Sequence, residues 1–176
     1  MYEAHGSHNE PQIIPIEGNM YRLLEDFVYI WTINGNPQRI TIKKGFEFDG
    51  ASISLLGTVV TALLPGFQTI YPMGLHIYAT LVHDFIWMYK GRLPEGVHER
   101  LLEDGTWVDA AYKPNGKRVW TMKTSNKLFI RMLREDKVGM KERRAMYISV
   151  QYTPNALWAW HSGKVPEDGR PKRLVV

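Results

Sequence analysis

The stretch from Gly74 to Tyr89 constrains this sequence more than any other feature, because it contains no Lys, Arg or Glu. It is long enough for several helical turns, and at about 100° per residue its polar side chains and one tryptophan fall within one arc of about 100°. The members of this arc are His76, Thr80, His83, Asp84 and Trp87. A helix that is apolar on its other sides is usually buried. We therefore predict a buried helix over 74–90, ended by Gly91, whose polar stripe lines an internal site or cleft.

The overall composition is that of one globular domain. The chain has 176 residues, of which 44% are hydrophobic and 23% are charged, and this length allows a real core. The net charge is +4, and the basic residues are scattered apart from short runs at 141–144 and 170–173. Nucleic-acid binders usually concentrate them more strongly, so we do not expect nucleic acid as a partner.

The chain has no cysteine, which excludes disulfides, thiolate zinc sites and a cysteine nucleophile. Any metal site must use His, Asp, Glu or Asn, and the absence of cysteine fits a reducing cytoplasm. The N-terminal residues are polar and show no signal-peptide pattern. The longest apolar run, 53–64, is too short to span a bilayer, so we expect no membrane span and instead predict a short buried helix there.

Strand and turn signals fill the N-terminal half. Residues 21–32 are rich in aromatic and β-branched side chains and predict one strand. The turn sequence Asn34-Gly35-Asn36-Pro37 leads into an alternating segment at 39–43, which predicts a β-hairpin. The next strand ends in a tight turn from which Asp49 and Ser52 project. Taken alone, Asp49 is read as a turn-former or a helix N-cap.

The C-terminal half reads as an insertion followed by two helices. Residues 92–104 are charged and are expected to be exposed, and a hairpin is predicted around Pro114-Asn115-Gly116, within an insertion of about 92–123. Helices are predicted over 125–136, with a Ser or Thr cap, and over 140–152. Trp158 and Trp160 are expected to pack on the core.

Together these elements predict an α+β fold. An N-terminal antiparallel β-hairpin or small sheet packs on the buried His-Asp helix and on two C-terminal helices, and a second β-hairpin is inserted. We expect a single globular domain over 13–161, with loose tails at 1–12 and 162–176.

Three separated motifs resemble one family. They are Phe46-x-Phe48-Asp49-Gly50-Ala51-Ser52-Ile53, then Ala79-x-x-x-His83-Asp84-x-x-Trp87, then Lys127-Leu-Phe129 with Arg144-Ala-Met-Tyr147 and a late Trp158. Over roughly 20–160 the chain resembles domain-of-unknown-function family 1353, which occurs mainly in bacteriophages and prophages. The resemblance implies a viral protein that acts in the cytoplasm of the infected host or in the virion, and it carries no established reaction.

The chain departs from this family in three ways. Ser54 stands where members usually have Pro, and the insertion at 92–123 is longer. Ser125-Asn126 stands where they usually have Ala-Asp, preceded by an Arg that is either Arg92 or absent. The resemblance thus implies a carboxylate where Asn126 supplies a neutral oxygen. An amide oxygen can coordinate a metal ion, but it cannot act as a general base.

The first functional hypothesis is a metal-assisted hydrolase. A His-Asp pair on a buried helix with a second His nearby resembles the arrangement in HD-type phosphohydrolases. Imidazole and carboxylate suit divalent Zn, Mn, Fe or Ni, and such an ion lowers the pKa of bound water. The candidate ligands are His83, Asp84, Asp49, His76 and Asn126, with Asp104 as an alternative to Asn126. The candidate catalytic residues are His83, Asp84, Asp49 and Ser52, and without a metal Asp84 would orient His83 beside Ser52 as nucleophile.

The second hypothesis is a non-enzymatic virion component, adaptor or host-interaction protein. In that case His83 and Asp84 belong to a buried structural network, since a buried carboxylate without partners costs several kcal/mol. The aromatic residues (6 Trp, 9 Tyr and 6 Phe) and the predicted exposed hairpin suit a protein–protein surface. The substrate, if there is one, is not identified by the sequence.

Overall fold

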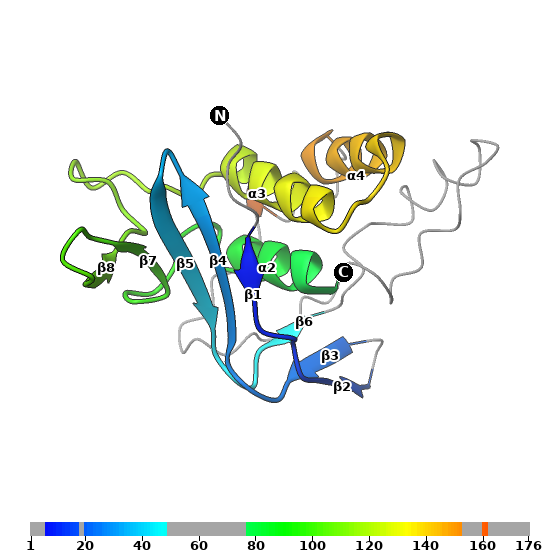
Figure 1. Cartoon of the computed structure of the whole chain (residues 1–176). Helices are drawn as coiled ribbons and strands as arrows, with labels where there is room; N and C mark the ends of the chain where they lie inside the picture. Colours follow the sequence, from blue (N-terminus) through cyan, green and yellow to red (C-terminus); the bar gives the residue numbers. More distant parts are fainter. Residues whose placement is uncertain (1–5, 18–19, 49–76, 153–159, 162–176) are drawn as a thin grey trace.

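A computed structural model of the chain describes residues 6–17, 20–48, 77–152 and 160–161. These residues form an α+β fold, as predicted, with two antiparallel sheets and three helices (Figure 1). The predicted helix at 53–64, the turn with Asp49 and Ser52, and the predicted C-terminal tail lie outside the described residues.

The larger sheet has five strands in the order β1-β4-β5-β7-β8. They span Ser7–His8, Phe27–Ile33, Asn36–Ile42, His98–Leu101 and Trp107–Asp109. The predicted hairpin is confirmed as β4–β5. Its turn residues Asn34 and Gly35 have φ values of 50° and 84°, the left-handed conformation that a two-residue hairpin turn requires.

The smaller sheet has the order β2-β3-β6, with strands Ile13–Ile16, Met20–Leu23 and Glu47–Phe48. The prediction of one strand over 21–32 is wrong, because the chain bends after Leu23 and its two parts join different sheets. Asp26 holds this bend. Its carboxylate accepts hydrogen bonds from the Lys44 backbone N–H at 2.9 Å and from Lys43 Nζ at 2.8 Å.

Two predictions for the 92–123 region are also wrong. Residues 92–104 are not all exposed, because Leu93 and His98 are each only 2% exposed and 98–101 form β7. β7 pairs with the free edge of β5 and satisfies its backbone groups, which an exposed loop would leave open. The inserted hairpin is β7–β8, whereas Tyr112 and Arg118 form only an isolated bridge.

The helices are α2 (Ile77–Met88), α3 (Met122–Glu135) and α4 (Met140–Tyr152). α3 begins earlier than predicted, because Thr121 is its N-cap and forms a capping box with Thr124. Gly91 follows α2 with a φ of 67° and donates its N–H to the carbonyl of Ile86 at 3.0 Å. Within the described residues, no helix is long and apolar enough to cross a membrane.

α2 lies between the larger sheet and α3, and α4 covers α3 (Figure 1). The largest fully buried side chains come from all of these layers and include Tyr29, Ile40, Leu81, Phe129 and Met132. Within the predicted N-terminal tail, Ser7 and His8 form β1, which pairs with β4. Its neighbour Gly6 donates its N–H to Glu135 at 3.0 Å, and Tyr29 Oη donates to the same carboxylate at 2.8 Å.

Candidate functional site: a buried His-Asp pair

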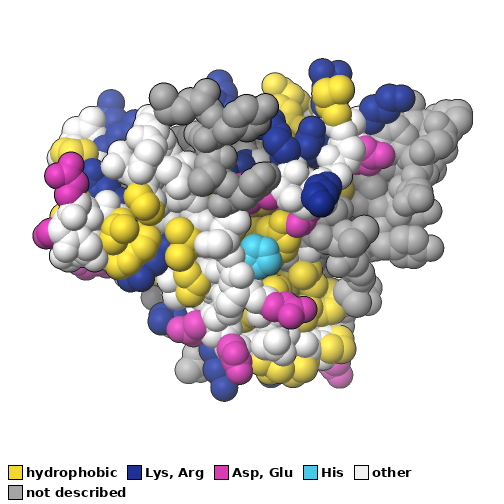
Figure 2. Space-filling view, viewed as in Figure 1, with side chains coloured by type: hydrophobic (Ala, Val, Ile, Leu, Met, Phe, Trp, Pro, Cys, Tyr) yellow, Lys and Arg dark blue, Asp and Glu magenta, His cyan; other side chains and the backbone are white. Residues whose placement is uncertain are grey.

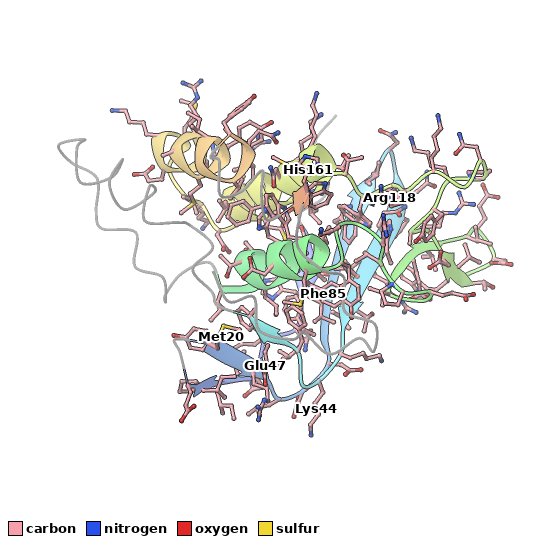
Figure 3. The ribbon with its side chains drawn as sticks, turned by 180° about the vertical axis from the view of Figure 1, so that it is seen from behind. Met20, Lys44, Glu47, Phe85, Arg118 and His161 are labelled. Atoms are coloured by element: carbon pink, nitrogen blue, oxygen red, sulfur yellow. The ribbon has the colours of Figure 1, made fainter. Side chains whose placement is uncertain are left out.

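Three residues of the polar stripe of α2, namely Thr80, His83 and Asp84, are buried, as the sequence predicts. His83 is 4% exposed and Asp84 is 8% exposed, and both lie in the middle of the helix. Seen from behind, α2 passes beneath α3 and α4, and Phe85 faces the smaller sheet (Figure 3), where its ring meets Phe46 at 5.1 Å. The His-Asp pair therefore sits inside the molecule and not on its rim.

Asn126 of α3 is a hydrogen-bond partner of His83. Its Oδ1 lies 2.8 Å from His83 Nε2 and also accepts the Trp87 indole N–H at 3.2 Å. Its Nδ2 donates to the Val150 carbonyl at 3.2 Å and to Gln151 Oε1 at 2.9 Å. Asn126 is fully buried, so this amide ties α2, α3 and α4 together at one point.

The partners of Asn126 determine which ring nitrogen of His83 carries a proton. An indole N–H can only donate and a backbone carbonyl can only accept, so Trp87 and Val150 fix the amide with Oδ1 toward His83. An amide oxygen accepts hydrogen bonds, and His83 Nε2 must therefore be the donor. In neutral His83 the second nitrogen, Nδ1, then carries no proton.

His83 Nδ1 faces the neighbouring carboxylate. The distance from Nδ1 to Asp84 Oδ1 is 3.6 Å. The Nδ1 lone pair and the carboxylate are both electron-rich, so their proximity is favourable only when a proton or a metal ion binds to them. The arrangement can therefore accept a proton at Nδ1, which Asp84 stabilises, or present one nitrogen and one oxygen ligand to a divalent cation.

Aromatic and hydroxyl side chains complete the surroundings of the pair. The His83 ring lies 4.8 Å from the Phe129 ring and 5.0 Å from the Trp87 ring. Trp87 also donates to Ser125 Oγ at 3.0 Å. Its ring forms a T-shaped contact with the ring of Trp160, with 5.3 Å between the ring centroids. Trp160 thus contacts α2 through Trp87, whereas Trp158 lies outside the described residues.

Of the predicted site residues, the structure brings His83, Asp84 and Asn126 together. Asp49, Ser52 and His76 lie outside the described residues. Asp104 is not at this site, because it is exposed in the β7–β8 turn and accepts the Thr106 N–H at 2.9 Å. In the parts of the chain that the structure describes, no three His, Cys, Asp or Glu side chains are grouped as metal ligands.

Sequence reasoning missed two members of the network. Gln151 was not singled out, and nothing in the sequence marks it, because its role depends on how α4 packs against α3. The sequence places Trp87 in the polar arc but does not indicate a role for it. Its position at four residues from His83 on one helix face is the signal that could have indicated a shared partner.

A second buried histidine, His98, lies elsewhere in the core. Its Nδ1 accepts the Trp120 indole N–H at 3.1 Å, and its ring stacks on Trp31 at 5.5 Å. Burial lowers the pKa of His98 to about 4, against weaker opposite effects of Asp109, the Ala110 backbone and Glu99. His98 is therefore neutral near pH 7 and belongs to the aromatic packing of the sheet.

Residues 21–150 match a family described as "Protein of unknown function (DUF1353)", and the chain belongs to this family. The matched range contains β4, β5 and all of α2 and α3, including the His-Asp pair and Asn126. No match to the chain was found among curated proteins or among solved structures.

Proposed function

We propose that this protein is hydrolase-like and that the His83–Asp84 pair is part of a divalent-metal site. The observation that supports this most is the orientation of Asn126, whose oxygen accepts a hydrogen bond from the Nε2–H of His83. The unprotonated nitrogen of His83, Nδ1, then lies 3.6 Å from Asp84 Oδ1. A histidine ligand whose second nitrogen donates to a fixed acceptor is the usual arrangement around protein-bound metals.

The proposed roles follow from the donor atoms. His83 Nδ1 and Asp84 Oδ1 are the two proposed ligand atoms whose positions the structure describes. Asp49 and His76 are the further proposed ligands. The oxygen of Asn126 already accepts from two N–H groups, so we assign it to positioning His83 and not to the ion. Ser52 is the proposed hydrogen-bond donor to the substrate. When bound, Zn, Mn, Fe or Ni acts as a Lewis acid that lowers the pKa of water.

The same pair supports general-base chemistry by this chain's own groups. Nδ1 is the only ring nitrogen of His83 that can take up a proton, because Nε2 already carries one. The imidazolium formed in this way is stabilised by Asp84 at 3.6 Å. Asn126 keeps the ring oriented throughout, since its oxygen accepts the hydrogen bond from Nε2–H in both charge states of the ring.

The second candidate function is a non-enzymatic adaptor or virion protein in which this cluster only holds three helices together. The observation that favours it is the complete use of the Asn126 amide by Trp87, His83, Val150 and Gln151. In either case the family resemblance supports a phage or prophage protein, acting in the infected host's cytoplasm or in the virion.

Metal content of the purified full chain, measured by elemental mass spectrometry, tests the proposal. We expect nearly one transition-metal ion per chain in the wild type and a loss of most of it in Asp84→Asn and His83→Gln. Asp104→Asn is the matched control, because it removes an exposed carboxylate outside the site. Circular dichroism shows whether each variant is folded.

A folded wild type that holds no metal as purified and takes up none when Zn, Mn or Ni is added would contradict the metal site. If the wild type does hold a metal ion, the metal-loaded protein is next screened for hydrolysis of phosphoester and peptidoglycan substrates. A metal content that is the same in folded Asp84→Asn as in the wild type would place the ion elsewhere and would favour the adaptor function.

A further inference from the structure

The positive charge of the chain is concentrated on its last two described helices. Residues 122–152 contain eight Lys and Arg and three Asp and Glu, which gives +5, whereas the whole chain is +4 and the remainder is therefore −1. The basic residues are Lys123, Lys127, Arg131, Arg134, Lys137, Lys141, Arg143 and Arg144. Figure 2 shows Lys and Arg side chains gathered over the α3–α4 part of the surface. Such a field attracts an acidic partner.

Two of the three carboxylates in this region are used inside the protein. Glu135 pairs with Arg131 Nε at 3.0 Å and accepts the Tyr29 hydroxyl, and Asp136 accepts the Tyr78 hydroxyl. Six of the eight basic side chains are exposed, namely Lys123, Lys127, Arg134, Lys137, Lys141 and Arg144. Their charge is therefore directed to the outside of the molecule.

The outer face of α4 combines this charge with large apolar side chains. Met140, Ile148 and Tyr152 are 59%, 56% and 65% exposed, and Arg144 lies between the first two at four-residue spacing, so that the four form one stripe along the helix. Within the described residues Arg144 has no ion pair. The opposite face of α4 is buried through Met146 and Val150.

We propose that this α4 stripe, Met140-Arg144-Ile148-Tyr152, is the docking surface for an acidic amphipathic segment of another protein. Such a segment places a carboxylate on Arg144 between apolar side chains that cover Met140 and Ile148. Tyr and Arg are the residue types that most often anchor protein interfaces. The surrounding lysines and arginines speed the encounter with an acidic partner.

The spacing of the stripe argues against other occupants. A membrane that took up Met140 and Ile148 would also bury the Arg144 guanidinium without a partner, which is costly. A nucleic-acid backbone would pair with Arg144 but would leave Met140 and Ile148 in water. A second copy of the chain would bring the same cluster of cations against itself.

The test uses the full chain and a fluorescent helical peptide that presents Leu, Glu and Leu at four-residue spacing. Fluorescence anisotropy is expected to show saturable binding. A matched peptide with Lys in place of Glu should bind at least tenfold more weakly. Arg144→Glu should reverse this preference, and Ile148→Ser should weaken both complexes. Lys113→Glu is the control, because it changes an equal charge in the exposed turn at 113–116.

Failure of the wild type to bind the Glu peptide, or equal binding by folded Arg144→Glu, would overturn the proposal. So would tighter binding to a DNA duplex or to phosphatidylserine vesicles than to the peptide, because the surface would then serve a nucleic acid or a membrane. Circular dichroism of each variant separates loss of binding from loss of folding. The substituted residues do not touch the His83–Asp84 pair, so the metal content is expected to stay unchanged.

Discussion

Asn126 Oδ1 lies 2.8 Å from His83 Nε2, in the buried space between α3 and α2. This contact has two consequences. It joins the helix that carries the His-Asp pair to α3, whose Asn126 also bonds α4, and it selects the ring nitrogen of His83 that carries the proton. Both consequences can be measured independently of any activity.

The first prediction concerns the tautomer of His83. Because the Asn126 oxygen accepts a hydrogen bond from His83 Nε2, neutral His83 in the metal-free protein should be the Nε2–H form, with an unprotonated Nδ1. Long-range proton–nitrogen NMR correlations of the imidazole ring report this directly, and a His83→Gln sample assigns the signals. An Nδ1–H form in the folded wild type would show that the proposed ligand nitrogen is occupied.

The second prediction concerns the stability of the helix junction. Asn126→Leu removes the amide that bonds both His83 and the Val150 carbonyl. It therefore leaves a buried donor and a buried acceptor without this hydrogen bond. We expect the free energy of unfolding to fall by about 2–4 kcal/mol, measured by urea denaturation. Lys127→Leu on the exposed side of the same helix should change it by no more than about 0.5 kcal/mol. Equal effects of the two substitutions would refute the junction.

The third prediction is a pH dependence caused by His98. The folded-state pKa is about 4 and the ordinary value is 6.5, so the unfolded chain binds a proton first as the pH falls. The contribution of neutral His98 to the free energy of unfolding is fully present above about pH 6.5. It is lost progressively down to about pH 4, by about 3 kcal/mol in all. Urea unfolding at several pH values measures it.

The His98→Gln variant is the control for that experiment, since glutamine does not titrate and its oxygen can accept from Trp120. The free energy of unfolding of the wild type should fall relative to that of this variant as the pH is lowered from 6.5 to 4. Asp26, whose pKa is lowered mainly by its hydrogen bond from Lys43, loses its contribution at lower pH, and in both proteins alike. A constant difference across this pH window would mean that His98 is not the cause.

The fourth prediction compares two glycines with similar backbone angles. Gly91 and Gly96 have φ values of 67° and 74°, so alanine is strained at both by about 1–2 kcal/mol. A Cβ at Gly91 would also clash with the Trp120 carbonyl, whereas a Cβ at Gly96 would meet nothing within 4 Å. We expect Gly91→Ala to be the more destabilising by about 1–3 kcal/mol in thermal or urea unfolding. Equal losses would mean that the contact at Trp120 is relaxed easily.

The local sequence was sufficient for the elements whose signals lie within a few residues of each other. The α2 helix is recognisable from its run without Lys, Arg or Glu, the β4–β5 hairpin from Asn34-Gly35, and α4 from the segment between Gly139 and Pro154. In each case hydrophobic periodicity and turn residues act over short distances, and the tertiary structure did not override them.

The errors arose where the partner is distant in the chain. The break between β3 and β4 depends on Asp26 meeting Lys43 and Lys44, and β7 depends on the open edge of β5. A charged segment such as 98–101 looks like a loop until a strand edge is available to pair with it. Register and edge pairing are properties of the sheet, and a single segment does not encode them.

For the candidate site, the sequence alone identified His83 and Asp84 as a buried polar pair, because a helix without other charges must enclose its few polar groups. It also pointed to position 126, through the resemblance. Only the tertiary structure decided what Asn126 does there. The amide is oriented by Trp87 and Val150, which lie on two other helices, and hydrogen-bond direction is set by such three-dimensional partners and not by residue type.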